Sequence, residues 1–295
     1  MIIDSAQLAA FAAVVREGSF ERAAGALHVT RSAVSQRIKQ LEERVGQVLI
    51  RRATPCLPTE AGQALLRHAQ QVALSEAEAL QTLGLAPDAG PHIAVGVNAD
   101  SLATWFVAAM ADAVQMAPMT FDVHVEDQDH SAHLLREGRV MAAVTSDPQP
   151  VQGCHVVRLG TMRYLAVASP AYRAAHFSRG LDAAALAQAP VLVFNRKDGL
   201  QNRFMRRITR KGIAPPVHWI PSSHAFVDAA LAGLGWGMNP VRLAQPLLDE
   251  GRLVELLPGQ AVDVPLYWQC WRLDVAALRV LTAAVQRQAA LSLGD

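Results

Sequence analysis

Residues 18–46 contain two short helical patterns separated by a tight turn, and this segment constrains the fold more than any other part of the chain. In the second pattern the apolar residues recur every three or four positions, which places them on one stripe of a helix. They are Val34, Ile38, Leu41 and Val45. Because successive helical residues turn by about 100°, the opposite face carries Ser32, Ser35, Gln36 and Lys39. Short polar and cationic side chains suit the edges of DNA bases and the phosphates.

The segments before this helix supply its partners. An inward stripe of a preceding helix consists of Phe20, Ala23, Ala24 and Leu27. Ser19 is its expected N-cap, and Thr30 is the expected N-cap of the helix that follows residues 28–30. A still earlier helix carries Leu8, Phe11, Val14 and Val15 and ends at Gly18. Three short helices that share a core, with the third in the major groove, form a helix-turn-helix.

The alternative is an ordinary helical hairpin with a solvated charged face. The Ser and Gln residues on the exposed face favour DNA reading over a merely soluble helix. Residues 47–52 and 56–58 are expected to pair as a short hairpin, the wing, around Thr54 and Pro55. The expected DNA-binding residues, with Arg31, Arg37 and Arg52 on phosphates, are Thr30, Arg31, Ser32, Ser35, Gln36, Arg37, Lys39, Arg51 and Arg52.

The runs at residues 23–24, 32–42 and 58–62 resemble those of LysR-type transcriptional regulators, and chain length and domain order match that family throughout. Within it, residues 35–42, 97–105, 125–129 and 266–268 are similar to the ArgP/LysG branch, which controls the export of basic amino acids. The resemblance implies a homodimer, assembled further into a tetramer, that binds an inverted repeat in double-stranded DNA. The wing here, at residues 53–57, lacks the basic residues usual in the family, which puts strong wing contact in doubt.

Composition sets the broad class. The chain has 295 residues and a net charge of +1, so the basic excess around residues 31–52 is local to the head. Its three cysteines follow neither a zinc spacing nor a disulfide framework, which favours a reducing cytoplasm. The N-terminus does not read as a signal peptide, and no apolar run approaches the length of a membrane span. No cofactor and no membrane partner are expected, whereas RNA polymerase is an allowed partner.

The fold class expected is a winged helix-turn-helix with a long linker helix, followed by a two-lobed α/β domain resembling periplasmic binding proteins. The head spans residues 1–58, the dimerising linker helix 59–83, a hinge 84–91 and the ligand domain 92–295. A helix at residues 60–83 has no body of its own to pack on, so pairing with a second copy is expected. Strands of a mostly parallel sheet are expected at 93–97, 120–126, 140–145, 156–159, 164–168, 191–194, 217–220, 237–238 and 266–271, and a last helix at 274–291.

Following the family, the chain is expected to cross between lobes at residues 160–163 and 263–267. The first lobe then holds residues 92–162 and 267–295, and the second holds 163–266. A cleft between two such lobes suits a small ligand at strand ends and helix N-termini. The expected ligand-binding residues are Asn98, Asp100, Ser101, Glu126, Asp127, Asp129, Thr145, Ser146, Phe194, Asn195, Ser222, Ser223, Met238 and Asn239.

The acids in this set favour a cationic ligand such as L-lysine or L-arginine, through charge-assisted hydrogen bonds, with Asp100 and Asp127 foremost. The alternative is that they are ordinary acids of helix N-termini, which are favourable anywhere. A metal site at Asp127, Asp129, His130 and His133 is not favoured, because no further ligand pair is evident.

The glycines of residues 233–237 stand in the wrong order for a dinucleotide turn. No catalytic spacing appears, so an enzyme is not expected. The alternative to an effector-responsive regulator is an architectural or replication-control protein that binds DNA with a vestigial cleft.

Overall fold

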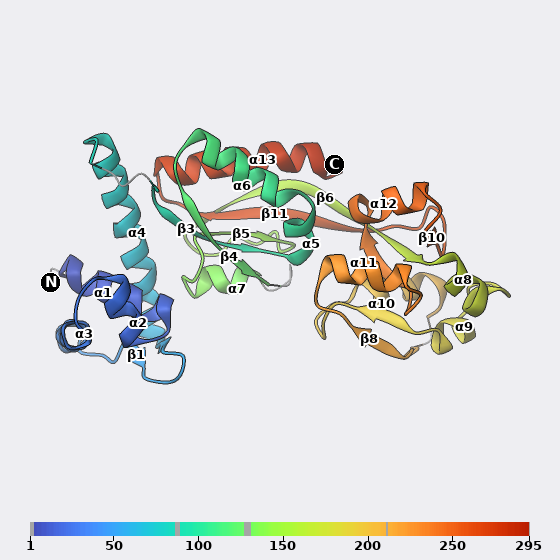
Figure 1. The fold of residues 1–295 in the computed structure, drawn as a ribbon, viewed down its shortest axis with the longest axis horizontal. Helices are drawn as coiled ribbons and strands as arrows, with labels where there is room; N and C mark the ends of the chain where they lie inside the picture. Colours follow the sequence, from blue (N-terminus) through green and yellow to red (C-terminus); the bar gives the residue numbers. More distant parts are fainter. Residues whose placement is uncertain (1–2, 86–88, 127–130, 211, 295) are drawn as a thin grey trace.

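The computed structural model describes residues 3–85, 89–126, 131–210 and 212–294. A small helical head lies at one end, a long helix leaves it, and two lobes follow along the longest axis of the molecule (Figure 1). Within the described ranges, no helix combines the length and apolar character needed to cross a bilayer.

The head consists of α1 (Ser5–Glu17), α2 (Phe20–Ala26), α3 (Arg31–Val45) and the antiparallel strands β1 (Ile50–Arg51) and β2 (Leu57–Pro58). Each helix begins at a side-chain cap, formed by Asp4, Ser19 and Thr30 respectively. Gly18 and Gly46 end α1 and α3 with φ values of 65° and 75°, which favour glycine. The predicted stripe packs into the core of the head, where Val34, Ile38 and Leu41 are fully buried.

The linker helix α4 (Glu60–Thr82) begins at Thr59, whose hydroxyl accepts a hydrogen bond from the Gly62 N–H at 3.1 Å. The expectation that this helix lacks a body of its own is wrong. Leu74 belongs to the apolar core of the first lobe. Farther along, Glu78 Oε1 accepts a hydrogen bond from the Ala276 N–H at 2.8 Å. The helix therefore lies against the lobe of its own chain.

A seven-stranded sheet of order β10-β6-β11-β5-β3-β4, in which β9 also pairs with β6, runs through both lobes. Its strands are β3 (His92–Val97), β4 (Thr120–Val125), β5 (Ala142–Thr145), β6 (Cys154–Ala168), β9 (Gly237–Pro240), β10 (Val254–Glu255) and β11 (Val262–Trp271). The second lobe adds a parallel pair, β7 (Val191–Val193) and β8 (Val217–Trp219).

The connection between the lobes differs from the prediction. Residues 156–159 and 164–168 were expected as separate strands, but both belong to the continuous strand β6, and β11 likewise passes through the second crossing. These two long strands pair antiparallel with each other and with β5, β9 and β10. The prediction of a mostly parallel sheet is therefore wrong, since among the described strands only β3 with β4 and β5, and β7 with β8, pair in parallel.

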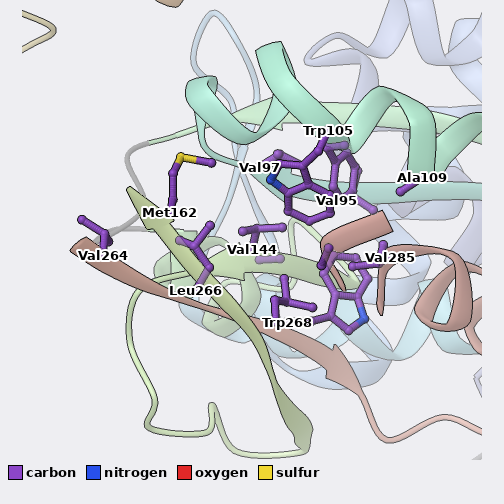
Figure 2. Close-up of a cluster of buried hydrophobic side chains, with 14 of the residues drawn as sticks. Val95, Val97, Trp105, Ala109, Val144, Met162, Val264, Leu266, Trp268 and Val285 are labelled. Atoms are coloured by element: carbon purple, nitrogen blue, oxygen red, sulfur yellow. The ribbon is translucent and has the colours of Figure 1, made fainter. Parts of the chain in front are cut away.

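Helices cover the sheet on both lobes. The first lobe carries α5 (Ala99–Ser101), a π-helical turn (Leu102–Phe106), α6 (Val107–Met116), α7 (Ser131–Arg136) and α13 (Ala276–Ser292). The second carries α8 (Pro170–Phe177), α9 (Ala183–Gln188), α10 (Leu200–Ile208), α11 (Ser223–Leu231) and α12 (Val241–Asp249). Figure 2 shows Trp105 and Trp268 packed with valine and leucine side chains between sheet and helices, where both indoles are almost fully buried. This core fixes the start of α5 at one end of the sheet.

Candidate DNA-reading surface and interlobe cleft

The outer face of α3 is available for contact. Ser32, Gln36 and Lys39 are exposed and Ser35 is half-buried, opposite the buried stripe. Thr30 serves the helix itself, because its hydroxyl caps the Ala33 N–H at 3.2 Å and bonds the Ser32 hydroxyl at 3.0 Å. The surface therefore presents hydroxyl, amide and ammonium groups on a helix whose opposite face packs into the core of the head.

The cations around this face have weak intramolecular partners. Arg31 lies 3.8 Å from Glu21, and Lys39 lies 3.7 Å from Glu43, with all four side chains largely exposed. Arg52 stacks on Phe20, with its guanidinium carbon 5.2 Å from the ring centre. Exposed ion pairs of this kind contribute little stability and exchange readily for phosphate.

The carboxylate of Glu42, which lies among the cations around α3, is engaged by backbone N–H groups. Its Oε1 accepts hydrogen bonds from the Leu49 N–H at 2.8 Å and the Ile50 N–H at 3.3 Å. The carboxylate therefore anchors the first strand of the wing against α3. Arg51 and Arg52, at the end of that strand, remain exposed.

A cleft opens between the lobes. Both lobes line it, with Asn98, Ala99, Asp100, Glu126, Phe194, Lys197, Asp198, Gly199, Leu200, Arg203, Ser223, Phe226, Met238, Asn239 and Pro240. Asp100 lies in the first turn of α5, where the free N–H groups of a helix start favour negative charge. Glu126 directly follows β4, so both acids stand at strand ends of the first lobe.

Asp100 is held from two sides. The Tyr164 hydroxyl, on the crossing strand β6, donates to its Oδ2 at 2.9 Å. The Ser223 hydroxyl, at the start of α11 in the second lobe, donates to its Oδ1 at 2.7 Å. The carboxylate therefore connects the two lobes through charge-assisted hydrogen bonds.

Glu126 also reaches across the cleft. Its Oε1 lies 3.3 Å from the ammonium nitrogen of Lys197 in the second lobe. Both side chains are partly exposed, at 37% for Glu126 and 45% for Lys197. This second contact between lobes leaves the ion pair accessible to a ligand.

Asn239 contributes a buried polar group to the cleft. It is 1% exposed, and its Nδ2 makes a long hydrogen bond of 3.4 Å to the Gly237 carbonyl. Its Oδ1 is buried and has no hydrogen-bond partner among the described residues. A buried acceptor without a partner is costly, and a ligand donor in the cleft would satisfy it.

Several predicted ligand residues lie outside the lining of the cleft. Ser101 is fully buried, and its N–H bonds the Asn98 side chain at 2.8 Å. Thr145 is buried and accepts from the Asp147 N–H, Ser146 is half-buried beside it, and Ser222 caps α11 through the Ala225 N–H. Asn195 is not among the lining residues, and its Oδ1 accepts from the Lys197 N–H in a turn. Asp127 and Asp129 lie outside the described residues.

The cleft also contains residues that the sequence reading missed, chiefly Lys197, Asp198, Leu200, Arg203 and Phe226. Asp198 stabilises the loop, because its carboxylate accepts hydrogen bonds from the N–H groups of Phe194 and Leu200, each at 3.0 Å. The Asn-x-x-Asp spacing at residues 195–198, typical of tight turns, could have indicated this loop. Nothing local indicated that Lys197 would face an acid of the other lobe.

Other polar signals have structural roles. Among the described residues, no three His, Cys, Asp or Glu side chains gather as a metal site. His133 pairs with Glu137 at 3.1 Å, and His130 lies outside the described residues. Burial raises the pKa of Cys154 to about 11 and of Cys270 to about 12, so both thiols stay protonated and unreactive. The glycine run at 233–237 joins α11 to β9, the order expected from the sequence.

Comparison with known proteins agrees with this architecture. Residues 5–63 match the family described as bacterial regulatory helix-turn-helix protein, lysR family, and residues 88–290 match the LysR substrate binding domain. The HTH-type transcriptional regulator LysG of Mycobacterium bovis is 51% identical over 288 residues, covering 97% of this chain and 94% of that protein. HTH-type transcriptional regulator ArgP of Pseudomonas aeruginosa is 46% identical over 284 residues, covering 96% and 94%.

Solved structures extend the match to the whole chain. The crystal structure of ArgP from Mycobacterium tuberculosis has a TM-score of 0.86 at 50% identity and covers all of both chains. Full-length LysG from Corynebacterium glutamicum with bound effector Arg has a TM-score of 0.77 at 40% identity, covering 99% of this chain and 100% of that one. The chain belongs to the LysR family of DNA-binding transcriptional regulators.

Proposed function

We propose that this regulator binds operator DNA through α3 and responds to L-arginine or L-lysine bound in the interlobe cleft. The main support for a cationic ligand is the pair of carboxylates, Asp100 and Glu126, that face the second lobe across the cleft. Each of these amino acids has two cationic groups and one carboxylate at neutral pH, so two acids and several hydrogen-bond donors complement it. The effector Arg bound by the LysG of C. glutamicum supports the same class.

The geometry suggests a division of roles. Asp100 and the unpartnered Oδ1 of Asn239 accept hydrogen bonds from the α-ammonium group. Glu126 receives the distal cation, while Phe194, Leu200, Phe226 and Met238 cover the aliphatic stem. Asp127 and Asp129, predicted from the sequence, remain proposed ligands of the same cation.

The DNA side of the proposal uses the predicted residues of α3 and the wing. Two copies paired through α4 place two reading helices in successive major grooves on one face of an inverted repeat. We propose a tetramer built from two such dimers, acting in the cytoplasm with RNA polymerase as a further partner and without catalysis. A relative from Corynebacterium efficiens, 43% identical, is a lysine export transcriptional regulatory protein. A gene for a basic amino-acid exporter is accordingly the proposed target.

The test combines calorimetry with footprinting on the DNA upstream of the regulator's own gene. L-Arginine or L-lysine should bind the wild type. Asp100→Asn should bind about tenfold more weakly, since a hydrogen bond to a charged group contributes about 1.5–3 kcal/mol. Glu126→Gln should bind up to about fivefold more weakly, because this acid is partly exposed. The matched control is Glu250→Gln, an acid of the second lobe that pairs with Arg252 away from the cleft. A footprint that no basic amino acid alters would instead favour the architectural alternative.

A further inference from the structure

The chain supplies its own cation to the cleft. Lys197 Nζ lies 3.3 Å from Glu126 Oε1, on the carboxylate that the proposed function gives to the distal cation of the effector. A lysine ammonium is chemically the group that L-lysine would bring, and it approaches from the opposite lobe. The two cations would compete for one acid, because like charges at hydrogen-bond distance repel.

The position of Lys197 is built into its loop. Its backbone N–H donates to Asn195 Oδ1 at 2.7 Å, and the same oxygen accepts from the Asp198 N–H at 3.1 Å. Asp198 in turn receives the Gln201 amide at 3.0 Å in addition to the backbone groups of the loop. Hydrogen bonds within residues 195–201 thus hold the turn that carries Lys197 without any ligand. The local sequence therefore places the Lys197 ammonium at the cleft.

We propose that Lys197 is an internal competitor that occupies Glu126 in the empty cleft and sets the effector concentration at which the regulator responds. This inference rests on the proposed function and deepens it. A basic amino acid replaces the Lys197 ammonium with its own distal cation. A neutral amino acid of the same length brings no charge for Glu126 and leaves the Glu126–Lys197 pair in place.

The experiment is calorimetric titration of the full-length protein with L-arginine and with L-citrulline, which has the same shape without the charge. Lys197→Met should bind L-arginine about fivefold more tightly than wild type, because a partly exposed ion pair contributes up to about a factor of five. Its affinity for L-citrulline should stay unchanged. The control is Arg196→Met, the neighbouring cation, which stacks over Trp219 at 5.5 Å and does not line the cleft.

A double-mutant cycle separates competition from a general change of the loop. In the Glu126→Gln background, Lys197→Met should leave L-arginine affinity unaltered, since the shared acid is gone. Lys197→Gln, which keeps a polar side chain, should also bind L-arginine more tightly. It replaces Lys197→Met in the test if the methionine variant does not fold. Weaker or unchanged L-arginine binding by both variants would overturn the proposal, with weaker binding making Lys197 a ligand of the effector carboxylate. Failure of wild type to bind either basic amino acid would instead refute the proposed function.

Discussion

Arg67 on the linker helix donates a hydrogen bond from Nη2 to the carbonyl of Arg136 at 2.9 Å, and the same nitrogen reaches the Leu135 carbonyl at 3.1 Å. These carbonyls belong to the last turn of α7, where unsatisfied acceptors and the negative end of the helix dipole favour a cation. Gly138 follows with a φ of 68°, and a Cβ there would lie 3.3 Å from the Arg67 side chain. Arg67 is thus one of the contacts that fasten the linker helix to the first lobe.

This contact predicts how Arg67→Met should behave. The variant should keep its L-arginine affinity, because Arg67 lies outside the cleft lining. It should lose part of the effector-dependent change in footprint, because movements of the first lobe then reach α4 only through the remaining contacts of Leu74 and Glu78. The matched control is Glu76→Gln, an exposed residue on the same helix. Parallel calorimetry and footprinting would contradict the coupling role if the Arg67 variant responds to effector like wild type.

Glu78 makes the second attachment of the linker helix. The N-cap position of α13, Val275, offers no side-chain oxygen, and Glu78 supplies the missing acceptor to the Ala276 N–H. Glu78→Ala should therefore destabilise the first lobe by about 1 kcal/mol, the usual effect of losing a helix cap. Thermal unfolding would show a midpoint lowered by about 2–4 °C. Glu76→Ala is the reference variant. If Glu78→Ala unfolds at the same temperature as Glu76→Ala, water replaces the cap without loss of stability.

The head could be predicted from the sequence because its signals are local. Ser19, Thr30, Gly18 and Gly46 mark helix ends within a few residues, and the apolar stripe of α3 needs no knowledge of the rest of the chain. The long crossing strands could not be predicted in the same way. Two strands were expected on either side of the crossing at residues 160–163, yet Gly160 lies within β6 with a φ of 136°, where a Cβ would lie 2.7 Å from the Gly294 carbonyl. The contact between Gly160 and Gly294 joins residues far apart in the sequence, so it could not be predicted from the residues around Gly160.

The cleft residues also fall into two groups, those that local sequence predicts and those that only the tertiary structure places there. Asp100 and Glu126 were predicted because each follows a strand of the first lobe, a rule that holds for α/β folds. Lys197 and Arg203 belong to the second lobe and line the cleft only because the two lobes meet there. Thr145 and Ser101 also follow the strand-end rule, but both are fully buried and neither lines the cleft.

On the DNA side, Gln36 and Lys39 should have separable effects. Gln36→Ala should relax sequence preference at one base position by about 1–3 kcal/mol, since a glutamine reads base edges. Lys39→Ala should weaken binding to all sequences and lower the slope of log K against log salt by about one. Glu43→Gln, which frees Lys39 from its partner at 3.7 Å, should act in the opposite direction. Binding titrations over a salt series on operator and random DNA would refute the assignment if both alanine variants changed only the salt slope.

Tyr164→Phe tests whether the position of the Asp100 carboxylate matters for ligand binding. The hydroxyl donates to Asp100 Oδ2 at 2.9 Å and approaches Met162 Sδ at 3.1 Å, and the Tyr164 side chain is fully buried. Removing it leaves the packing of the ring intact but releases one side of the acid. L-Arginine affinity should fall by less than about tenfold, because the hydrogen bond is already present before the ligand binds and only the fixed position of the carboxylate is lost. Tyr172→Phe, whose hydroxyl bonds the Pro190 carbonyl outside the cleft, is the control.

Arg163 and Asp263 face each other on β6 and β11 where these strands pass between the lobes, joined by two hydrogen bonds of 2.8 and 3.0 Å. The Arg163 hydrogen bonds hold the pKa of Asp263 below its ordinary value of 3.8, with the charges of Arg163, Arg207 and Arg203 adding to the effect. An acid whose folded pKa is depressed stabilises the fold above its unfolded pKa, and this contribution disappears as the pH falls through the folded value.

The stability difference between wild type and Asp263→Asn should therefore be constant from pH 7 to about pH 5 and shrink below pH 4. Because both side chains are largely exposed, at 61% and 43%, the plateau should stay below about 1 kcal/mol. Urea unfolding of both proteins across this pH range measures the difference directly. Glu250→Gln removes another exposed acid of a pair, with Arg252, that does not lie at the crossing, and serves as the control. A difference that grows on acidification would mean that the protonated form of Asp263 is the more stabilising one at the crossing, which contradicts the role assigned to Arg163.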